Sequence, residues 1–417
     1  MKTTHLTFAL LLTVATAASA QVEPAATGPR NPLPSGNLSY SAHYSQTAEF
    51  GTSQGNYQTS NLSADVDYTN GKERHPLRLE YGGGYTWTIS GPAYQTGVFQ
   101  HLFLSQGFVW HKWNVTASDD VSYRPQAPLT GFSGIPGTGE PIGVTNPSPP
   151  SSQSILTVDT HVVDNSATGE AEHQIGYATT LRAGGSYQLL RYPDGNGLNY
   201  DTQSADAGLD RRLNARNTLT ASYVFSLFKY PDYDFSLMTN SGMFGFKRDW
   251  TRKISTEVSV GPQWTESPDS ATPPLETGVA VNASATYHYR FQSASLNYTR
   301  GVNSGGGYLL GAESDAVTGD FSQDFGKNLT IGLSGAYRRT SGIENTILGQ
   351  SGPEIIDSEY GGVQATRRLG RYLTFFAGYT AVQQSSPSGL PTNVLHGLEQ
   401  VVNFGVGYSP REMHLRH

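Results

Sequence analysis

The feature that most constrains this chain is a two-residue alternation of apolar and polar side chains, which recurs from residue 36 to residue 408. In residues 254–264, for example, Ile254, Val258, Val260 and Trp264 share one parity, and the positions between them are mostly Ser, Glu and Gln. A period of two is typical of a β-strand, whose side chains point alternately to opposite faces. The pattern therefore predicts an all-β protein whose strands each have one apolar face and one polar face.

The predicted strands are joined by two kinds of connection. Short, charged turns occur near positions 213, 250, 290, 325 and 369, whereas the other connections are longer and rich in Gly, Pro, Asn and Ser. The longest of these covers residues 124–154. Short turns at one end and long loops at the other are typical of outer-membrane β-barrels.

The alternation predicts about eighteen strands, within a range of 16–20 for a barrel of this kind. Each has about 10–13 residues, which is enough to cross a bilayer at a tilt of about 45°. The expected strands are 36–46, 57–69, 77–89, 98–109, 113–123, 167–177, 180–190, 200–210, 217–228, 237–249, 252–264, 277–289, 292–301, 314–325, 328–340, 358–369, 371–382 and 397–408.

Two all-β architectures compete for this pattern. The turns recur about every 35–45 residues, which overlaps the repeat length of β-propellers. A propeller blade, however, contains four short strands, and only two longer strands fit each period here. Because strand edges cannot be left unpaired in hydrocarbon, we predict a closed, antiparallel, up-and-down transmembrane β-barrel. A propeller or another exported all-β fold is the alternative.

Composition is consistent with a barrel that has a wet interior. The chain has 27 basic and 34 acidic residues, a net charge of −7, which excludes a protein that binds nucleic acid through its phosphates. Hydrophobic residues make up 36% of the chain, although aromatic residues reach 11%. Few apolar residues combined with many aromatic ones argue against disorder and favour a fold that encloses water.

The ends of the chain indicate export. Lys2, the apolar run Leu6–Val14 and the small residues Ala18-Ser19-Ala20 predict that residues 1–20 are a cleaved signal peptide. We expect 21–35 to be a flexible periplasmic lead-in, 36–408 the transmembrane barrel and 409–417 a polar C-terminal tail. The chain has no Cys, so it has neither disulfides nor a lipidated cysteine.

The stretches LFLSQGFVWHKWNVTASDDVSYRPQAP (102–128) and DRRLNARNTLTASYVFS (210–226) resemble bacterial outer-membrane β-barrels of the porin type. The chain looks most like the uncharacterised outer-membrane barrel proteins of acidobacteria. This resemblance implies a bacterial outer-membrane location, contact with the lipid bilayer and with the outer-membrane assembly machinery, and passage of small hydrophilic solutes. It leaves both a monomer and a homotrimer open.

The same resemblance bears on two segments. In porins the loop equivalent to 124–154 folds inward, which implies a constriction here; a surface lid is the alternative. Such barrels also end on an aromatic residue that the assembly machinery reads, whereas this chain continues for nine residues after Tyr408. Either Tyr408 is an internal signal or the last strand ends elsewhere.

Charged residues on the predicted polar face are the candidate pore lining. They could set a transverse field and a mild selectivity, or they could form salt bridges that rigidify the wall. These residues are Asp65, Asp67, Arg78, Glu80, Arg182, Glu257, Arg338, Arg367 and Glu399. Aromatic residues at the strand ends are expected at the membrane interfaces, and these are Trp87, Trp113, Trp250, Trp264 and Tyr408.

No sequence motif points to catalysis, a cofactor or a metal. The segment GFSGIPG (131–137) lacks the strand–turn–helix context of a nucleophile elbow. His161 and His173, which have acids between them, and the pair Asp119-Asp120 could bind a metal, but solvated loop residues and a strand end are the simpler interpretations. We therefore expect a passive diffusion channel and not an enzyme. The alternative is a non-conducting scaffold or a surface-polysaccharide export partner, whose lumen could be plugged by residues 21–35.

Overall fold

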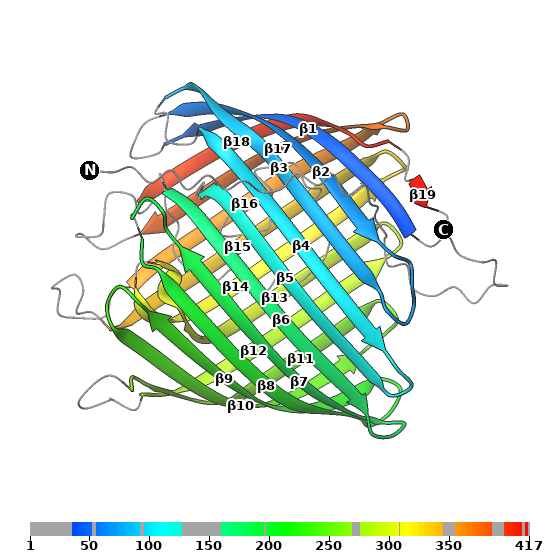
Figure 1. Cartoon of the computed structure of the whole chain (residues 1–417), viewed down its shortest axis with the longest axis vertical. Coiled ribbons are helices and arrows are strands. Elements are labelled where there is room, and N and C mark those ends of the chain that lie inside the picture. The colour runs from blue at the N-terminus through cyan, green and yellow to red at the C-terminus, as the bar shows by residue number, and fades with distance from the viewer. Residues whose placement is uncertain are drawn as a thin grey trace.

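The chain forms a closed β-barrel of eighteen long strands (Figure 1). The computed structural model describes residues 36–51, 56–91, 96–126, 160–195, 197–268, 276–307, 309–344, 355–385, 396–410 and 413–415. The strands are β1 (Gly36–Phe50), β2 (Tyr57–Thr69), β3 (Leu77–Ser90), β4 (Gly97–Val109), β5 (Trp113–Gln126), β6 (Thr160–Gln174), β7 (Thr179–Arg191), β8 (Tyr200–Arg212), β9 (Asn217–Tyr230), β10 (Phe235–Asp249), β11 (Ile254–Glu266), β12 (Glu276–Tyr289), β13 (Gln292–Asn303), β14 (Leu310–Phe325), β15 (Leu329–Glu344), β16 (Ile355–Leu369), β17 (Leu373–Ser385), β18 (Gly397–Tyr408) and the short β19 (Met413–Leu415).

Every long strand pairs antiparallel with the strands before and after it in the sequence. The ring closes between β18 and β1, where Ala42–Phe50 pair with Gln400–Tyr408. Below that seam, β19 continues the edge by pairing Met413–Leu415 with Gly36–Leu38 of β1. The prediction of a closed, up-and-down, antiparallel barrel of eighteen strands is confirmed.

The large apolar side chains identify the outward face of the wall. On β11, Ile254, Val258 and Val260 are 40%, 49% and 47% exposed, and they alternate with Glu257 and Ser259. In a closed barrel, exposed apolar side chains on alternate positions must lie on the outside, so the residues between them face the lumen. We call these two sets of positions the outer rows and the inner rows.

The strands are long enough to span a bilayer. The described strands of the ring run from 12 residues in β13 to 16 residues in β14. At about 3.3 Å per residue and a tilt of about 45°, such strands rise about 30 Å, which matches the thickness of a hydrocarbon core. Among the described residues, no helix is long and apolar enough to cross a membrane.

Most strand boundaries lie within a few residues of the prediction, and the last long strand, 397–408, has the expected bounds. The sixth strand was misplaced: it was expected at 167–177 and runs from Thr160 to Gln174. The turn that follows the strand sets its C-terminal end. The Ile175 amide donates to the Thr179 carbonyl (3.1 Å), so Ile175 begins the turn instead of continuing the strand.

Several expected segments lie outside the described residues. They are the signal peptide 1–20, the lead-in 21–35 and all but the first three residues of the loop 124–154. Residues 124–126 belong to the end of β5. The tail 409–417 is described in part, and it contains the strand β19, which was not anticipated.

Candidate functional site: the inner wall of the barrel

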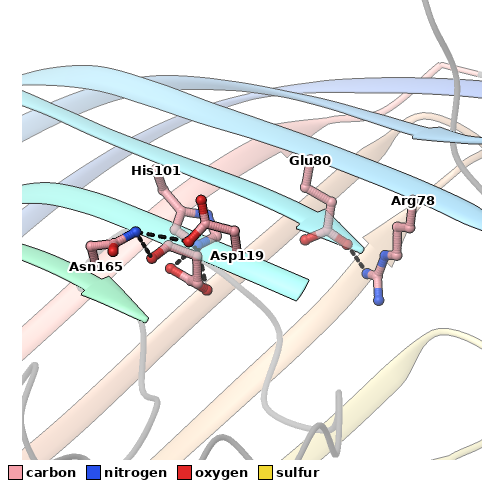
Figure 2. Close-up of polar contacts among 6 residues, drawn as sticks. Arg78, Glu80, His101, Asp119 and Asn165 are labelled. Carbon is pink, nitrogen blue, oxygen red and sulfur yellow. Dashed lines mark hydrogen bonds and ion pairs between the residues drawn. The ribbon is translucent and has the colours of Figure 1, made fainter. Parts of the chain in front are cut away.

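Four of the predicted pore-lining residues lie together on the inner rows of β2 and β3. Asp67 is opposite Glu80 across the strand pair, and Asp65 is opposite Gly82. The Arg78 guanidinium forms an ion pair with Glu80 and lies 4.0 Å from the Asp67 carboxylate. Figure 2 shows Arg78 and Glu80 extending from the same strand toward each other. The Arg78 guanidinium is thus shared between the carboxylates of Glu80 and Asp67.

Asp65 is held by side chains of β1. His43 Nε2 lies 3.4 Å from Asp65 Oδ2, and the Ser41 hydroxyl donates to the same carboxylate (3.2 Å). Ser41 Oγ is also 2.8 Å from His43 Nε2. This is not the geometry of a catalytic triad, in which the serine and the carboxylate contact different ring nitrogens. Here both contact Nε2, so the three residues form a hydrogen-bonded cluster.

The neighbouring acids Asp119 and Asp120 point to opposite sides of β5. Asp120, on the inner row, lies 3.1 Å from His101 Nε2. Asp119 is opposite the exposed Leu104, on the outer row, and accepts a hydrogen bond from the Asn165 amide (2.8 Å). Figure 2 shows Asp119 and Asn165 joined by this hydrogen bond. Two carboxylates on opposite faces cannot share a cation, so the idea of a metal site there is wrong. The pair also lies within β5 and not at its end.

Two further predicted residues form cross-strand ion pairs on the inner rows. Arg182 Nη2 of β7 lies 2.9 Å from Asp210 Oδ1 of β8. Glu257 of β11 lies 3.7 Å from Lys247 Nζ of β10. Both pairs are partly exposed to the lumen.

Arg338 and Glu399 occupy inner rows but have little contact with solvent. Arg338 is 9% exposed and Glu399 is fully buried. Glu399 belongs to a small buried group near the long-loop end, together with Glu49, which is 2% exposed, and Tyr57, whose hydroxyl donates to the Glu49 carboxylate. The position of these side chains on the polar face was predicted, whereas their burial was not.

Arg367 differs from the prediction. It is paired with Leu329 on one side and with Phe375 on the other, and Phe375 is 48% exposed on an outer row. Arg367 therefore points outward near the short-turn end of β16. The alternation of apolar and polar residues is interrupted at ATRRL (365–369). Because two arginines follow one another there, the sequence does not show which of them lies on the polar face.

The predicted interface aromatics are found at strand ends. Trp113 begins β5 and lies 4.2 Å from the ring of His173. Trp250 follows β10, carries the Arg248 guanidinium over its ring at 4.1 Å and donates to Thr256 (2.9 Å). The remaining three, Trp87, Trp264 and Tyr408, lie toward the ends of β3, β11 and β18.

The histidines with metal-binding potential are also separated by the fold. His161 and His173 lie at opposite ends of β6. His161 Nδ1 is 2.7 Å from Asp194, while His173 packs on Trp113. Among the described residues, no group of three or more His, Asp or Glu side chains could hold a metal ion.

Sequence reasoning missed an apolar cluster on the inner rows near the long-loop end. It is centred on Tyr200, Tyr230 and Leu237, which are at most 2% exposed. Its other members are Val162, Leu190, Tyr192, Leu198, Phe228 and Leu310, with Phe235, Val302 and Ile343 packed against them. The signal was present in segments such as YQLLRY (187–192) and FSLFKY (225–230), where apolar residues occupy both parities at the end of a strand.

A turn between β13 and β14 is anchored to this cluster. The Tyr230 hydroxyl donates to the Ser304 carbonyl (2.9 Å), a contact between residues far apart in the sequence. The following 3₁₀ turn, η2 (Gly305–Gly307), leads to the buried Leu309 and Leu310. Gly311 has a positive φ of 79°, and a Cβ there would lie 2.4 Å from a Leu237 methyl group. Glycine is therefore required for this close approach.

Comparison with known proteins adds a structural likeness. No protein-family model and no curated protein sequence match the chain. OccK2 (OpdF) of Pseudomonas aeruginosa is similar to 90% of this chain over 97% of its own length, with 11% identity and a TM-score of 0.47. OccAB2 of Acinetobacter baumannii is similar to 90% of this chain over 98% of its own, with 10% identity and a TM-score of 0.48.

Proposed function

We propose that the chain forms a passive, porin-like diffusion channel for small hydrophilic solutes in the outer membrane of a bacterium. The observation that carries this proposal is the division of the wall into two chemically distinct faces. Exposed apolar residues such as Val258 and Val260 follow the outer rows, while Glu257, Ser259 and Gln263 follow the inner rows of the same strand. A closed ring of eighteen strands is wide enough to enclose an aqueous channel.

In this proposal, Asp65, Asp67, Arg78, Glu80, Arg182 and Glu257 line the water-filled path. Their ion pairs fix charged groups at defined heights on the wall, which would give the path a local field. Arg338 and Glu399 would contribute to this field without lining the water-filled path, because both are buried. Trp113 and Trp250 would mark the interface at the short-turn end, and Trp87 and Trp264 the opposite interface.

The remaining parts of the proposal concern the ends of the chain and its partners. Residues 1–20 would direct export and be removed, 21–35 would form a periplasmic lead-in, and the barrel would be inserted by the outer-membrane assembly machinery. The loop 124–154 would narrow the lumen or cover its mouth. A trimeric assembly fits the proposal as well as a monomer does.

Conductance tests the channel directly. The mature chain, refolded in detergent and shown to be folded by heat-modifiable gel migration, is added to a planar bilayer. Discrete conductance steps and liposome swelling with small sugars are the expected results. A protein that migrates as a folded barrel and never conducts would contradict the proposal.

The second candidate is a non-conducting scaffold or export partner. It is favoured by the apolar cluster around Tyr200, Tyr230 and Leu237, which occupies part of the lumen near the long-loop end. The same measurement separates the candidates, because a scaffold of this kind would give a folded barrel without conductance steps.

A further inference from the structure

We propose that the channel prefers cations and that the acidic inner wall of β6, β7 and β8 sets this preference. The inference rests on the proposed channel function and narrows its substrates to inorganic cations and small cationic solutes. It follows from the balance of charge over the inner rows, from the contacts that occupy the basic side chains, and from the exposure of the remaining acids.

Glu170 and Asp206 form the centre of this wall. Gly184 of β7 lies between them, paired with Glu170 of β6 on one side and with Asp206 of β8 on the other. A Cβ on Gly184 would lie 2.5 Å from Asp206 Oδ1, so the carboxylate occupies the space left by the missing side chain. Both acids are exposed. Two solvated carboxylates therefore face the lumen with no side chain between them.

The other described inner-row charges of β6–β8 do not offset these acids. Glu172 lies opposite Arg182, but the Arg182 guanidinium is bound to Asp210 at 2.9 Å. Arg212, the other base, is at the short-turn end of β8. Asp164 adds a further carboxylate, to which the Gln188 amide donates (3.1 Å). The wall thus has more acids than bases even after its ion pair is counted.

The bases elsewhere on the inner rows whose side chains the structure describes are also ion-paired, buried or at a strand end. Arg78 is shared between Glu80 and Asp67, and Lys247 lies 3.7 Å from Glu257. Arg338 is 9% exposed, and Arg368 stands beside the turn that ends β16. Since each paired base is matched by at least one acid, the remaining acids of β6–β8 leave the described inner rows with an excess of negative charge.

A negative excess in a confined aqueous path raises the local concentration of cations and lowers that of anions. The range of this effect depends on salt, because the Debye length is about 10 Å at 0.1 M and about 3 Å at 1 M. Selectivity should therefore be clear in dilute salt and weaker in concentrated salt.

The test is the reversal potential of the full mature chain in a planar bilayer under a KCl gradient. In dilute salt we expect a potassium-to-chloride permeability ratio above about 3 for the wild type, falling toward 1 near 1 M salt. Replacing the two central acids together (Glu170→Gln with Asp206→Asn) should reduce the dilute-salt ratio by about half or more.

Asp119→Asn is the matched control. It makes the same chemical change as Asp206→Asn, but on the outer face of the wall beside Asn165. The ratio should stay at the wild-type value. Equal changes in the control and in the double variant would overturn the assignment to β6–β8.

The wild type alone tests the inference if the double variant does not fold. A wild-type channel that conducts without preferring potassium overturns the inference and leaves the channel function intact. A folded barrel that does not conduct overturns the channel function itself, so the two failures are distinguishable.

Discussion

Two regions of the inner wall are built from the same alternating strands, but one is lined by polar side chains and the other by buried apolar ones. The wall of β1–β5 contains polar residues such as Asp65, Arg78 and His101, which remain partly exposed and contact His43, Asp67 and Asp120, respectively. The long-loop end of β6–β10 and β14 instead contains the cluster of Tyr200, Tyr230 and Leu237, which is closed to solvent. In both regions the large exposed apolar side chains lie on the outer rows.

The difference shows that the alternation determines whether a side chain points into or out of the barrel. It does not determine whether an inward side chain is exposed to water. Partly exposed ion pairs contribute little to stability, because the Coulomb attraction is screened and the side chains lose entropy. Buried aromatic and aliphatic side chains contribute far more. We therefore expect the apolar cluster to stabilise the barrel, and the charged inner rows, chiefly those of β6–β8, to control which solutes pass.

The strongest test of this division is the truncation Leu237→Ala. Leu237 is 2% exposed within the cluster, so the change removes a buried side chain and leaves a cavity. The free energy of unfolding should fall by about 2–5 kcal/mol. Equilibrium unfolding in urea from lipid vesicles, followed by tryptophan fluorescence, would measure it. A loss below about 0.5 kcal/mol, which is the size of a typical surface change, would refute the role of the cluster.

A smaller effect is expected from Tyr230→Phe. The substitution keeps the packed ring and removes the hydroxyl that donates to the Ser304 carbonyl, which is then left without this donor. The expected loss is about 1–3 kcal/mol in the same unfolding measurement.

Tyr337→Phe serves as its control. The Tyr337 hydroxyl also donates a hydrogen bond, to Asp357 at 2.9 Å, but on the exposed outer face. Its loss of stability should be the smaller of the two. The opposite order would show that the anchor between β9 and the β13–β14 turn is unimportant.

Arg182→Gln should change stability least and selectivity in a defined direction. The Arg182–Asp210 pair is partly exposed, so the free energy of unfolding should fall by at most about 1 kcal/mol. Loss of the base adds to the negative excess of the wall, so the potassium-to-chloride ratio should rise. A fall in that ratio would contradict the charge balance on β6–β8.

The fold was largely predictable because a bilayer barrel imposes a strict rule on every strand. Ile254, Val258 and Val260 could be placed on the outer rows from their parity alone. The rule fails where parity is ambiguous, as at Arg367, and where a polar residue such as Asp119 occupies an outer position. It is silent about packing inside the lumen, because the cluster around Tyr230 joins side chains from strands that are not neighbours in the sequence.

The seam between β18 and β1 has a consequence for how the molecule is made. Its two edges come from opposite ends of the chain, and β19 supplies the last few hydrogen-bonded positions along β1. This junction has the greatest sequence separation of any strand pair, so joining it carries a high entropic cost and comes late. Until the C-terminal residues arrive, the edge of β1 lies open to pairing with another molecule. Closing the seam with β18 and β19 therefore also protects the edge of β1 from pairing with another molecule.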